Sequence, residues 1–598
     1  MNQLADGTYI GGEGCELPSS PDKMYKVNTF ALFFANDGSG HAGLWRSDGT
    51  KNGTYFISDL DSIDFSASVS EAYSTGSLLY FVKYLQVYDS STGKTYGSPK
   101  ELWRSDGTTA GTFPVFSGAD KRIDENFWNN NPEYEVKGAT IGSNFFFVAS
   151  QQIGDTVYSN IYKTNGTVAG TTPYFQIYKA RGTIETPFIT GTLKIISFNN
   201  QLYFNYPNEE TGWEIWAGDG INPPHLYCDF NPGPLGTVVG EWINLNDQYL
   251  ILSASIYTSV SKWTNKILRI KSNDACPVVI DENAGNSDNG YNPSFHSSSS
   301  NDYCITDNKF FFENYSGTGS RLLEATNGEI NGTFSVPFDY LVLNGVHTKG
   351  LIFTEGLIDT KTYTWNGNSP TSYDIFSDSL NATEANGYFS PNRVIQLDTA
   401  VFIAGSSGNN NIVWQTNVNG SYCYRVSTLN LYFKGVNLGD TAYLALGDAF
   451  PSGTFPCGTE PVLLKKFDKV WTGKISSDWN NNSNWLPSGV PKFTESVVIP
   501  RTQYNPVING QASCKDLFLN NENSYLNNQG ITVNKSANLD VHGYYFSLRG
   551  SDINGEGSLT RKGTFVNTTY GDGAYNIDSI NINGADWDLT SMNFSEPN

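Results

Sequence analysis

The chain has 598 residues, a formal net charge of −22 and only 16% charged residues. This acidic balance argues against binding nucleic acid through phosphate-neutralising patches, and no apolar run is long enough for a membrane span. Aromatic residues make up 14% of the chain, which also holds 59 Gly. Such a composition favours strands joined by turns over helices.

Three strong copies of one motif lie in the first third of the chain. Gly43–Thr54 reads Gly-Leu-Trp-Arg-Ser-Asp-Gly-Thr-Lys-Asn-Gly-Thr, Glu101–Thr112 repeats it, and Ile161–Thr171 is an altered copy. Weaker copies follow around Trp216, Trp365 and Trp414. The spacing of roughly 40–60 residues is the period of propeller blades.

The residues around each motif predict four antiparallel strands. An apolar strand such as Phe30–Phe34 comes first, and the Leu-Trp strand returns beside it. Asp-Gly predicts a tight type I′ turn, after which Gly-Thr opens an outer strand. The apolar strands mark nine units, near Phe30, Leu79, Phe146, Tyr203, Leu250, Phe311, Ile352, Val401 and Tyr443.

We therefore predict an all-β fold that begins with a large β-propeller over residues 1–467. The motif count gives nine blades, and eight is the alternative because nine exceeds the usual range. The N-terminal strand within Ala5–Ile10 is expected to complete the last blade and so close the ring.

Residues 468–598 form a second predicted domain with a different pattern. Short apolar pairs alternate with Asn and Gly, which predicts a β-solenoid, with a β-sandwich as the alternative. Trp471, Trp479 and Trp485 open this region. We expect them to cap the solenoid core, and stacking on sugars is the other interpretation.

These features resemble two known families. The repeat units are similar to the ELWxxDGT repeats of exported bacterial proteins, often from Bacteroidota. The pattern from Trp471 to Pro500 resembles a module of surface proteins exported by the type IX secretion system. The resemblance implies periplasmic passage to the cell surface or the medium. It also implies, as partners, the type IX translocon and its cargo-binding outer-membrane components.

Both ends of the sequence bear on that expectation. Met1–Thr8 lacks the basic and apolar regions of a signal peptide, so either the protein stays in the cytoplasm or a leader was removed before Met1. The composition and the resemblance favour a removed leader. Cargo proteins of this kind end in a sorting domain, and Met592–Asn598 does not resemble one. Truncation, cleavage or a different route would each account for this.

Seven Cys residues allow disulfides in an oxidising compartment. We expect the pairs Cys276–Cys304 and Cys423–Cys457, with Cys514 unpaired. The Cys and His spacings match no metal site, so no metal or cofactor is expected.

Two further sets of residues are candidates for modification and for ligand binding. The implied phylum O-glycosylates Asp-Ser/Thr before a small or aliphatic residue, which gives Ser62, Thr156, Ser379, Thr399, Thr441 and Ser579. Predicted blade loops carry rings that suit carbohydrate stacking beside amide side chains, unless the rings fold back onto the blades. These are Tyr88, Tyr96, Trp128, Trp263 and Tyr291.

The motifs of common catalytic sites are absent from the sequence, including His-Glu-x-x-His and the nucleophile elbow. We therefore expect no catalytic residues and predict a non-enzymatic, adhesin-like exported binding protein, with roles in attachment or gliding and with surface glycans as partners. One alternative is a carbohydrate-active enzyme that uses acids such as Glu209 and Glu210. A structural spacer is the other.

Overall fold

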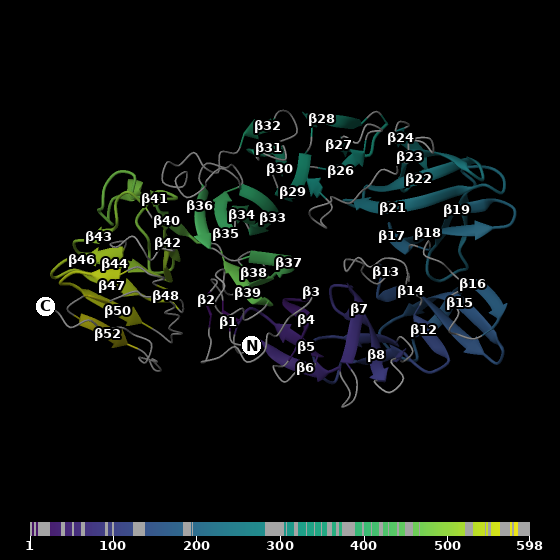
Figure 1. The fold of residues 1–598 in the computed structure, drawn as a ribbon, viewed down its shortest axis with the longest axis horizontal. Coiled ribbons are helices and arrows are strands. Elements are labelled where there is room, and N and C mark those ends of the chain that lie inside the picture. The colour runs from purple at the N-terminus through teal and green to yellow at the C-terminus, as the bar shows by residue number, and fades with distance from the viewer. Residues whose placement is uncertain are drawn as a thin grey trace. The chain divides into compact units, whose positions relative to one another are not determined.

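A computed structural model describes the chain within residues 3–9, 24–123, 138–182, 193–281, 304–372, 389–465 and 467–583, with short gaps inside several of these ranges. Nearly all of the described elements are strands (Figure 1). The helical content of this part is one 3₁₀ turn, η1 (Asn482–Asn484). No described helix has the length and apolar character needed to cross a membrane.

The chain divides into two compact units. One unit comprises residues 21–48 and 52–373, and the other comprises residues 1–20, 49–51 and 374–598. This division falls within the predicted propeller, not at residue 467. Packing explains part of the difference, because Phe467 contacts Phe518 with ring centroids 4.9 Å apart. The last antiparallel strands are thereby attached to the C-terminal region.

The first unit consists of consecutive antiparallel sheets, each made mainly by neighbouring strands in chain order. The first sheet contains β3 (Met24–Val27), β4 (Phe30–Asn36), β5 (Ala42–Ser47) and β6 (Tyr55–Asp59). The second contains β7 (Ser66–Ser74), β8 (Leu79–Asp89), β9 (Lys94–Gly97), β10 (Glu101–Ser105) and β11 (Phe113–Phe116). The third contains β12 (Lys121–Ile123), β13 (Gly138–Ile141), β14 (Asn144–Ile153), β15 (Thr156–Thr164) and β16 (Thr172–Arg181). The next four are β17 (Ile195–Phe198), β18 (Gln201–Asn208), β19 (Gly212–Gly218) and β20 (His225–Cys228); β21 (Thr237–Leu245), β22 (Tyr249–Ser259), β23 (Lys262–Ile270) and β24 (Val278–Asp281); β25 (Cys304–Thr306), β26 (Lys309–Tyr315), β27 (Arg321–Thr326) and β28 (Thr333–Asp339); and β29 (Leu341–His347), β30 (Gly350–Glu355), β31 (Lys361–Trp365) and β32 (Pro370–Ser372).

Successive sheets from β3 to β28 pack their faces against one another. Phe81 on β8 joins the core of the preceding sheet around Leu32 and Leu44. Tyr80, its neighbour on the same strand, instead packs with Phe145 and Phe147 of the following sheet. Because alternate residues of one strand serve opposite faces, the apolar strands read as continuous hydrophobic runs. Four-stranded meanders packed face to face in this way are β-propeller blades.

The second unit begins with two more antiparallel sheets. These contain β33 (Phe389–Leu397), β34 (Ala400–Ser407), β35 (Asn410–Asn417) and β36 (Cys423–Ser427); and β37 (Asn430–Asn437), β38 (Ala442–Asp448) and β39 (Thr459–Lys465). All nine predicted apolar strands are therefore strands of separate antiparallel sheets. The number of blades in a closed ring stays a prediction.

The N-terminal strands differ from the predicted outer strand of the last blade. β1 (Gln3–Leu4) pairs with β2 (Thr8–Tyr9) in a two-stranded sheet of their own. β1 lies next to β39, but among the described strands no ladder joins the two.

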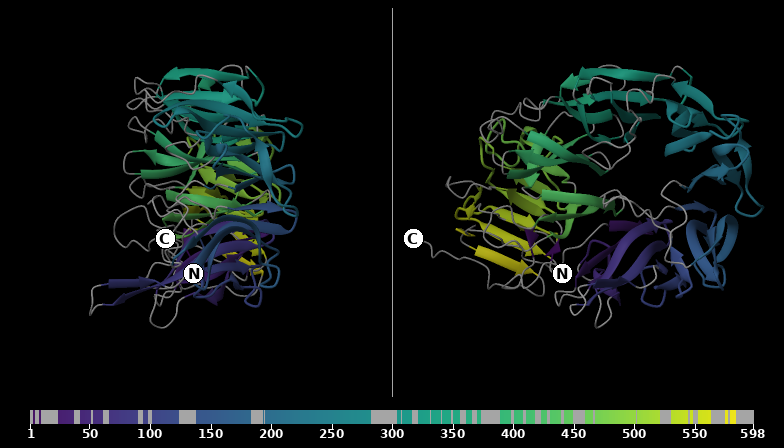
Figure 2. Two further views of the ribbon diagram at one scale, coloured as in Figure 1. Left: turned by 90° about the vertical axis from the view of Figure 1, so that its right-hand side faces the viewer. Right: turned by 45° about the vertical axis from the view of Figure 1, so that its right-hand side comes forward.

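After residue 468 the strand pairing becomes parallel, apart from one antiparallel pair in which Val470 lies opposite Leu486. One sheet contains β40 (Lys469–Trp471), β41 (Trp485–Leu486), β42 (Val497–Pro500), β45 (Leu517–Asn520) and β48 (Phe546–Ser547). The second has β43 (Val507–Ile508), β46 (Gly530–Val533), β49 (Asp552–Asn554) and β51 (Tyr575–Asn576). The third has β44 (Gln511–Cys514), β47 (Asn538–Val541), β50 (Ser558–Lys562) and β52 (Ser579–Asn583). Successive coils stack strand on strand, visible in yellow in Figure 2, so this domain is a β-solenoid.

The three Trp residues at the start of the solenoid belong to its core. Trp471, Trp479 and Trp485 are 0–1% exposed and pack against Val497 and Ile508. Their indoles form a tight group, with centroids of Trp479 and Trp485 4.7 Å apart. This burial fits the predicted capping role and leaves no ring face for stacking on a sugar.

The turns of the repeat differ from the predicted type I′ hairpin. Type I′ requires positive φ at both central residues, whereas in Asp106-Gly107 only Gly107 has a positive φ, +86°. The outer strand begins six residues later, at Phe113. Consecutive positive φ angles occur instead between the first two strands of a sheet, at Asn199 and Asn200 and at Asn246 and Asp247.

Candidate functional site

The repeated Ser-Asp-Gly-Thr-x-x-Gly-Thr segment folds into a closed loop held by its own side chains. In the second sheet, Asp106 Oδ1 accepts hydrogen bonds from the Thr108 amide (3.0 Å) and hydroxyl (2.7 Å). Thr108 Oγ1 in turn accepts from the Gly111 amide at 3.0 Å. Ser105 and Thr112 close the base of the loop with their hydroxyls 2.8 Å apart. The polar residues of the motif are therefore used within the loop.

The altered copy keeps the same bonds with Asn in place of Asp. Asn165 Oδ1 accepts from the Thr167 amide and hydroxyl, and Thr167 Oγ1 accepts from the Gly170 amide. The second motif glycine is needed because a Cβ at Gly170 would collide with the Asn165 side chain. Gly111 stands in the same relation to Asp106. Hydrogen bonding, not charge, is thus the common role of this Asp or Asn.

The first motif glycine packs against the preceding sheet. A Cβ on Gly107 would lie 2.5 Å from the ring of Phe30, which belongs to β4 of the sheet before. Gly220 has the same relation to Phe146, and Gly328 to Tyr249, both at 2.6 Å. These three loops therefore each sit on an aromatic side chain of the preceding sheet, and only Gly leaves room for that ring. In the third copy, a Cβ on Gly166 would instead meet Leu78 first.

A basic side chain adds a second link between neighbouring sheets. The residue after the motif aromatic is Arg104 in the second sheet and Lys163 in the third. Arg104 Nη1 donates to the Gly166 carbonyl of the next loop at 3.3 Å, and Lys163 Nζ donates to the Gly220 carbonyl at 3.2 Å. We call this combination of glycine, underlying ring and basic donor the inter-sheet latch.

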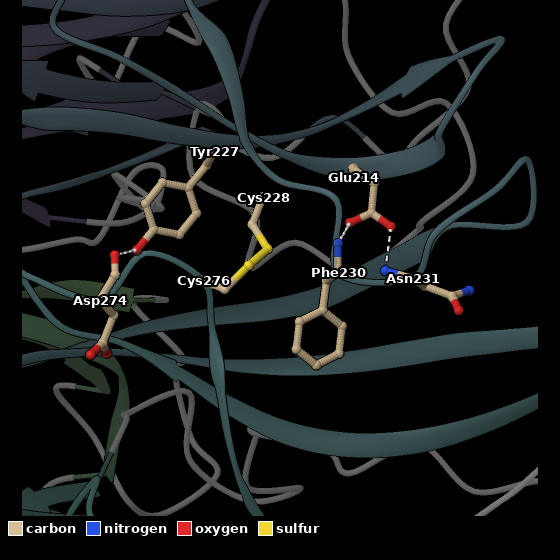
Figure 3. The surroundings of a disulfide bond; sticks show 7 residues. All are labelled: Glu214, Tyr227, Cys228, Phe230, Asn231, Asp274 and Cys276. Atoms are coloured by element: carbon tan, nitrogen blue, oxygen red, sulfur yellow. Dashed lines mark hydrogen bonds between the residues drawn. A yellow bond between two sulfur atoms is a disulfide. The ribbon is translucent and has the colours of Figure 1, made fainter.

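A disulfide connects the fourth and fifth sheets. Cys228, at the end of β20, is bonded to Cys276 in the loop between β23 and β24, with Cα atoms 5.3 Å apart (Figure 3). Tyr227 Oη also donates to the Asp274 carbonyl in that loop. The predicted pair Cys276–Cys304 is wrong because Cys276 is already bonded to Cys228. Cys457 lies outside the described residues, so the pair Cys423–Cys457 stays a prediction.

Cys514 is free, and it is buried in the solenoid core. The thiol is therefore unpaired in the described part of the chain, as predicted. Burial raises its pKa far above the ordinary value, so the thiol remains protonated and poorly nucleophilic.

A buried carboxylate lies beside the disulfide. Glu214 on β19 is fully buried, and its two oxygens accept hydrogen bonds from the Phe230 and Asn231 amides at 3.1 and 3.0 Å (Figure 3). Asn231 Nδ2 in turn donates hydrogen bonds to the Gly236 and Tyr257 carbonyls. Burial is the main cause that raises the pKa of Glu214 to about 7, and Asp229 adds to it. Glu214 thus fixes the connection between the fourth and fifth sheets.

Sequence reasoning missed this carboxylate. Glu214-Ile-Trp216 occupies the same motif position as Glu101-Leu-Trp103. Glu101 instead accepts a hydrogen bond from its own strand neighbour, Trp103 Nε1, at 2.9 Å. The alignment of the two acids was the available signal, but burial by a connecting loop is not readable from a strand pattern.

The predicted ligand-binding residues that the structure describes lie on two different sheets. Tyr88 and Tyr96 lie on the β8–β9 hairpin, opposite Thr95 and Val87. Trp263 lies on β23, in a different sheet, and packs against Tyr257. Trp128 and Tyr291 lie outside the described residues. Several predicted loops are paired strands, because β8 and the β22–β23 hairpin extend further than the apolar pattern indicates.

The predicted O-glycosylation residues are only partly described. Thr156 is half-buried at the start of β15, with Oγ1 3.1 Å from Asp155 Oδ1. Ser579 opens β52 and pairs with Ser558 in the solenoid. The other four, Ser62, Ser379, Thr399 and Thr441, lie outside the described residues. Within the described part, no group of three or more His, Cys, Asp or Glu side chains is arranged to hold a metal ion.

One family model matches the C-terminal region of the chain. Residues 470–591 match a family described as a domain of unknown function (DUF8693). A search of curated proteins finds no significant match.

Among solved structures, the chain is similar to a puromycin hydrolase, at 9% identity and a TM-score of 0.29 over 75% of this chain and 62% of that one. It is also similar to a prolyl endopeptidase, at 9% identity and 0.33, over 72% and 55%. A third similar structure is the β-propeller domain of the Trilobed protease from Pyrococcus furiosus, at 9% and 0.27, over 60% and 98%. The chain thus spans less than two thirds of the first two proteins.

These neighbours correct the expected function. We predicted a non-enzymatic binding protein of the adhesin type, whereas the similar solved structures are peptidases and a protease propeller domain. The non-enzymatic assignment therefore has no support. At identities of 9% and TM-scores near 0.3, the likeness does not transfer peptidase activity to this chain either.

Proposed function

We propose that this chain acts outside the cytoplasm as a rigid repeat scaffold that holds its variable hairpins in fixed positions. The observation that carries the proposal is the Cys228–Cys276 disulfide. Disulfides persist in oxidising compartments and are rare in reducing ones. Here the bond joins two successive sheets at a point already held by the Glu214 and Tyr227 hydrogen bonds.

The contacts made by the repeated motif residues support a scaffold role. The Asp106 and Asn165 side chains accept hydrogen bonds from residues of their own loops. The motif glycines and basic residues make contacts to the next sheet. The repeated residues therefore hold neighbouring sheets together.

The scaffold proposal predicts that the disulfide contributes substantially to stability. Cys276→Ser should lower the free energy of unfolding by about 2–4 kcal/mol, because the bond closes a long loop. Denaturant unfolding under non-reducing conditions measures this. Cys228→Ser and the double variant provide the matched controls, and both should equal Cys276→Ser. Additive losses in the double variant would mean that the two thiols act separately.

We propose type IX secretion as the route of export, on the resemblance of Trp471–Pro500 to cargo modules. Fractionation of the source cells tests this proposal. The chain should reach the surface or medium in wild-type cells and accumulate in the periplasm when the translocon is inactivated. Unchanged export without the translocon would contradict the route while leaving the scaffold proposal intact.

A further inference from the structure

We propose that one face of the β22–β23 hairpin is a binding subsite for the pyranose ring of a neutral oligosaccharide. The proposal rests on four residues, Ser255, Tyr257, Trp263 and Asn265. It goes beyond the scaffold role and does not depend on it.

The strand register places these four side chains on one face. Tyr257 pairs with Trp263, and Ser255 pairs with Asn265. Directly opposed residues of an antiparallel pair share a face, as do residues two apart on one strand. Two rings near the hairpin turn are therefore followed, one step deeper, by a hydroxyl and an amide.

The two rings form a half-exposed aromatic surface. Tyr257 and Trp263 have centroids 5.6 Å apart and planes inclined by 38°, and both side chains are half-buried. The turn beyond them is open to solvent, with Val260 89% exposed. A sugar could reach the rings from this side and place its C–H groups against them.

The amide of Asn265 supplies an independent indication of a ligand. Asn265 is 0% exposed, and its Oδ1 accepts a hydrogen bond from Ser255 Oγ at 2.7 Å. Its Nδ2 has no hydrogen-bond partner in the structure. A buried unmade hydrogen bond costs about 1–3 kcal/mol, so such groups normally have partners.

The chemistry of the four residues matches a pyranose. The rings match its apolar face. The unpaired Asn265 amide nitrogen is enclosed in the unliganded chain, and it donates to one of the sugar hydroxyls when the side chains that cover it shift on binding. The backbone beneath the rings is held in place, since the Tyr257 carbonyl accepts from Asn231 Nδ2 at 2.9 Å. Thr258 Oγ1 donates to the Lys262 carbonyl across the turn. The rings are therefore pre-positioned, which limits the entropy lost on binding.

The test is titration of the full chain with a set of neutral hexasaccharides. The set comprises cellohexaose, xylohexaose, mannohexaose, laminarihexaose and chitohexaose. Binding is measured by calorimetry and by indole fluorescence. At least one should bind saturably. Trp263→Ala should weaken that binding by about tenfold or more, Trp263→Tyr should restore most of it, and Asn265→Leu should weaken it by about fivefold.

Tyr178→Ala is the matched control. Tyr178 is 37% exposed on β16, in another sheet, and its removal should change affinity less than twofold. The variants are compared only after each shows the wild-type unfolding midpoint within error. For a variant that fails this check, chemical-shift changes of the Asn265 side-chain amide in wild-type protein take its place. Saccharide binding should shift that resonance.

Three results would overturn the proposal. The first is that none of the five saccharides binds. The second is that Trp263→Ala weakens saccharide binding no more than Tyr178→Ala does, or that the Asn265 side-chain resonance does not shift when saccharide binds. The third is that adenosine, a planar stacking ligand, binds through Trp263 while the saccharides do not. None of these results bears on the disulfide or the scaffold proposal.

Discussion

Glu214 is a buried carboxyl whose protonation is linked to the stability of the fold. In the folded chain its pKa is raised to about 7 by burial, against an ordinary value of 4.5. A carboxyl that is harder to ionise in the folded state favours folding while it is protonated. Its contribution is therefore complete below pH 4.5 and is lost as the pH rises to about 7.

This sign gives a testable pH dependence. Wild-type protein should lose up to about 3 kcal/mol of unfolding free energy between these two pH values. Glu214→Gln should be flatter over the same range, although less stable at its best because one backbone amide loses its acceptor. Urea unfolding across the pH range measures both. Glu210→Gln, at the exposed β18–β19 turn, is the control and should follow wild type.

Cys514 gives a second prediction at the scale of single residues. Burial in the solenoid raises the pKa of its thiol, which leaves almost no thiolate. Alkylation by iodoacetamide at mildly alkaline pH should be slow in the folded chain and rapid in denaturant. Peptide mass spectrometry follows the modified residue. Rapid labelling in the native protein would mean that the solenoid core opens readily.

At the scale of elements, the repeated loop acts through its contact with the neighbouring sheet. Gly107 and Gly76 have nearly the same backbone conformation, with φ of +86° and +89°. A Cβ on Gly107 would meet Phe30, whereas a Cβ on Gly76 would meet nothing within 4 Å. Comparing Ala substitutions at Gly107 and Gly76 therefore distinguishes the cost of backbone strain from the cost of losing the inter-sheet contact.

Both glycine variants should be destabilised by the positive φ, by about 1 kcal/mol. Gly107→Ala should lose a further 1–3 kcal/mol or so, because the methyl group must displace the Phe30 ring. Chemical denaturation of the two proteins side by side measures the difference. Equal losses of unfolding free energy would show that Gly107 is needed only for its positive φ and that the inter-sheet latch contributes little to stability.

Strand identity could be predicted because it follows from local pattern. Runs such as Phe145–Val148 stand out by apolar content and become the central strands. Turn type could not, because the Asp106 loop depends on hydrogen bonds among five separated positions: Ser105, Asp106, Thr108, Gly111 and Thr112. Asp-Gly alone indicated a shorter turn than the one that forms.

The disulfide shows where sequence proximity misleads. Cys276 and Cys304 are closer in the chain than Cys228 and Cys276, which made them the expected pair. In the fold, the end of β20 and the β23–β24 loop belong to neighbouring sheets and meet face to face. The partner of Cys276 is decided by sheet packing, and a strand pattern does not report that packing. The same holds for Glu214, whose burial depends on the 229–236 connection.

At the scale of the whole molecule, two kinds of β repeat share one chain. Antiparallel sheets extend to Lys465, and parallel stacking begins at Lys469. In both parts each repeat buries its apolar residues against the next, so neighbour contacts supply the core. A long acidic chain can be stable in this way without a single central core.

The most direct test of the account is disulfide mapping of the protein isolated from its source without reduction. The cells are lysed in denaturant so that every free thiol, including the buried Cys514, is blocked. The protein is then digested, and linked peptides are identified by mass spectrometry. The account predicts a peptide pair joined through Cys228 and Cys276, and a blocked Cys514. Recovery of Cys228 and Cys276 as blocked thiols would contradict an extracytoplasmic, disulfide-bonded scaffold.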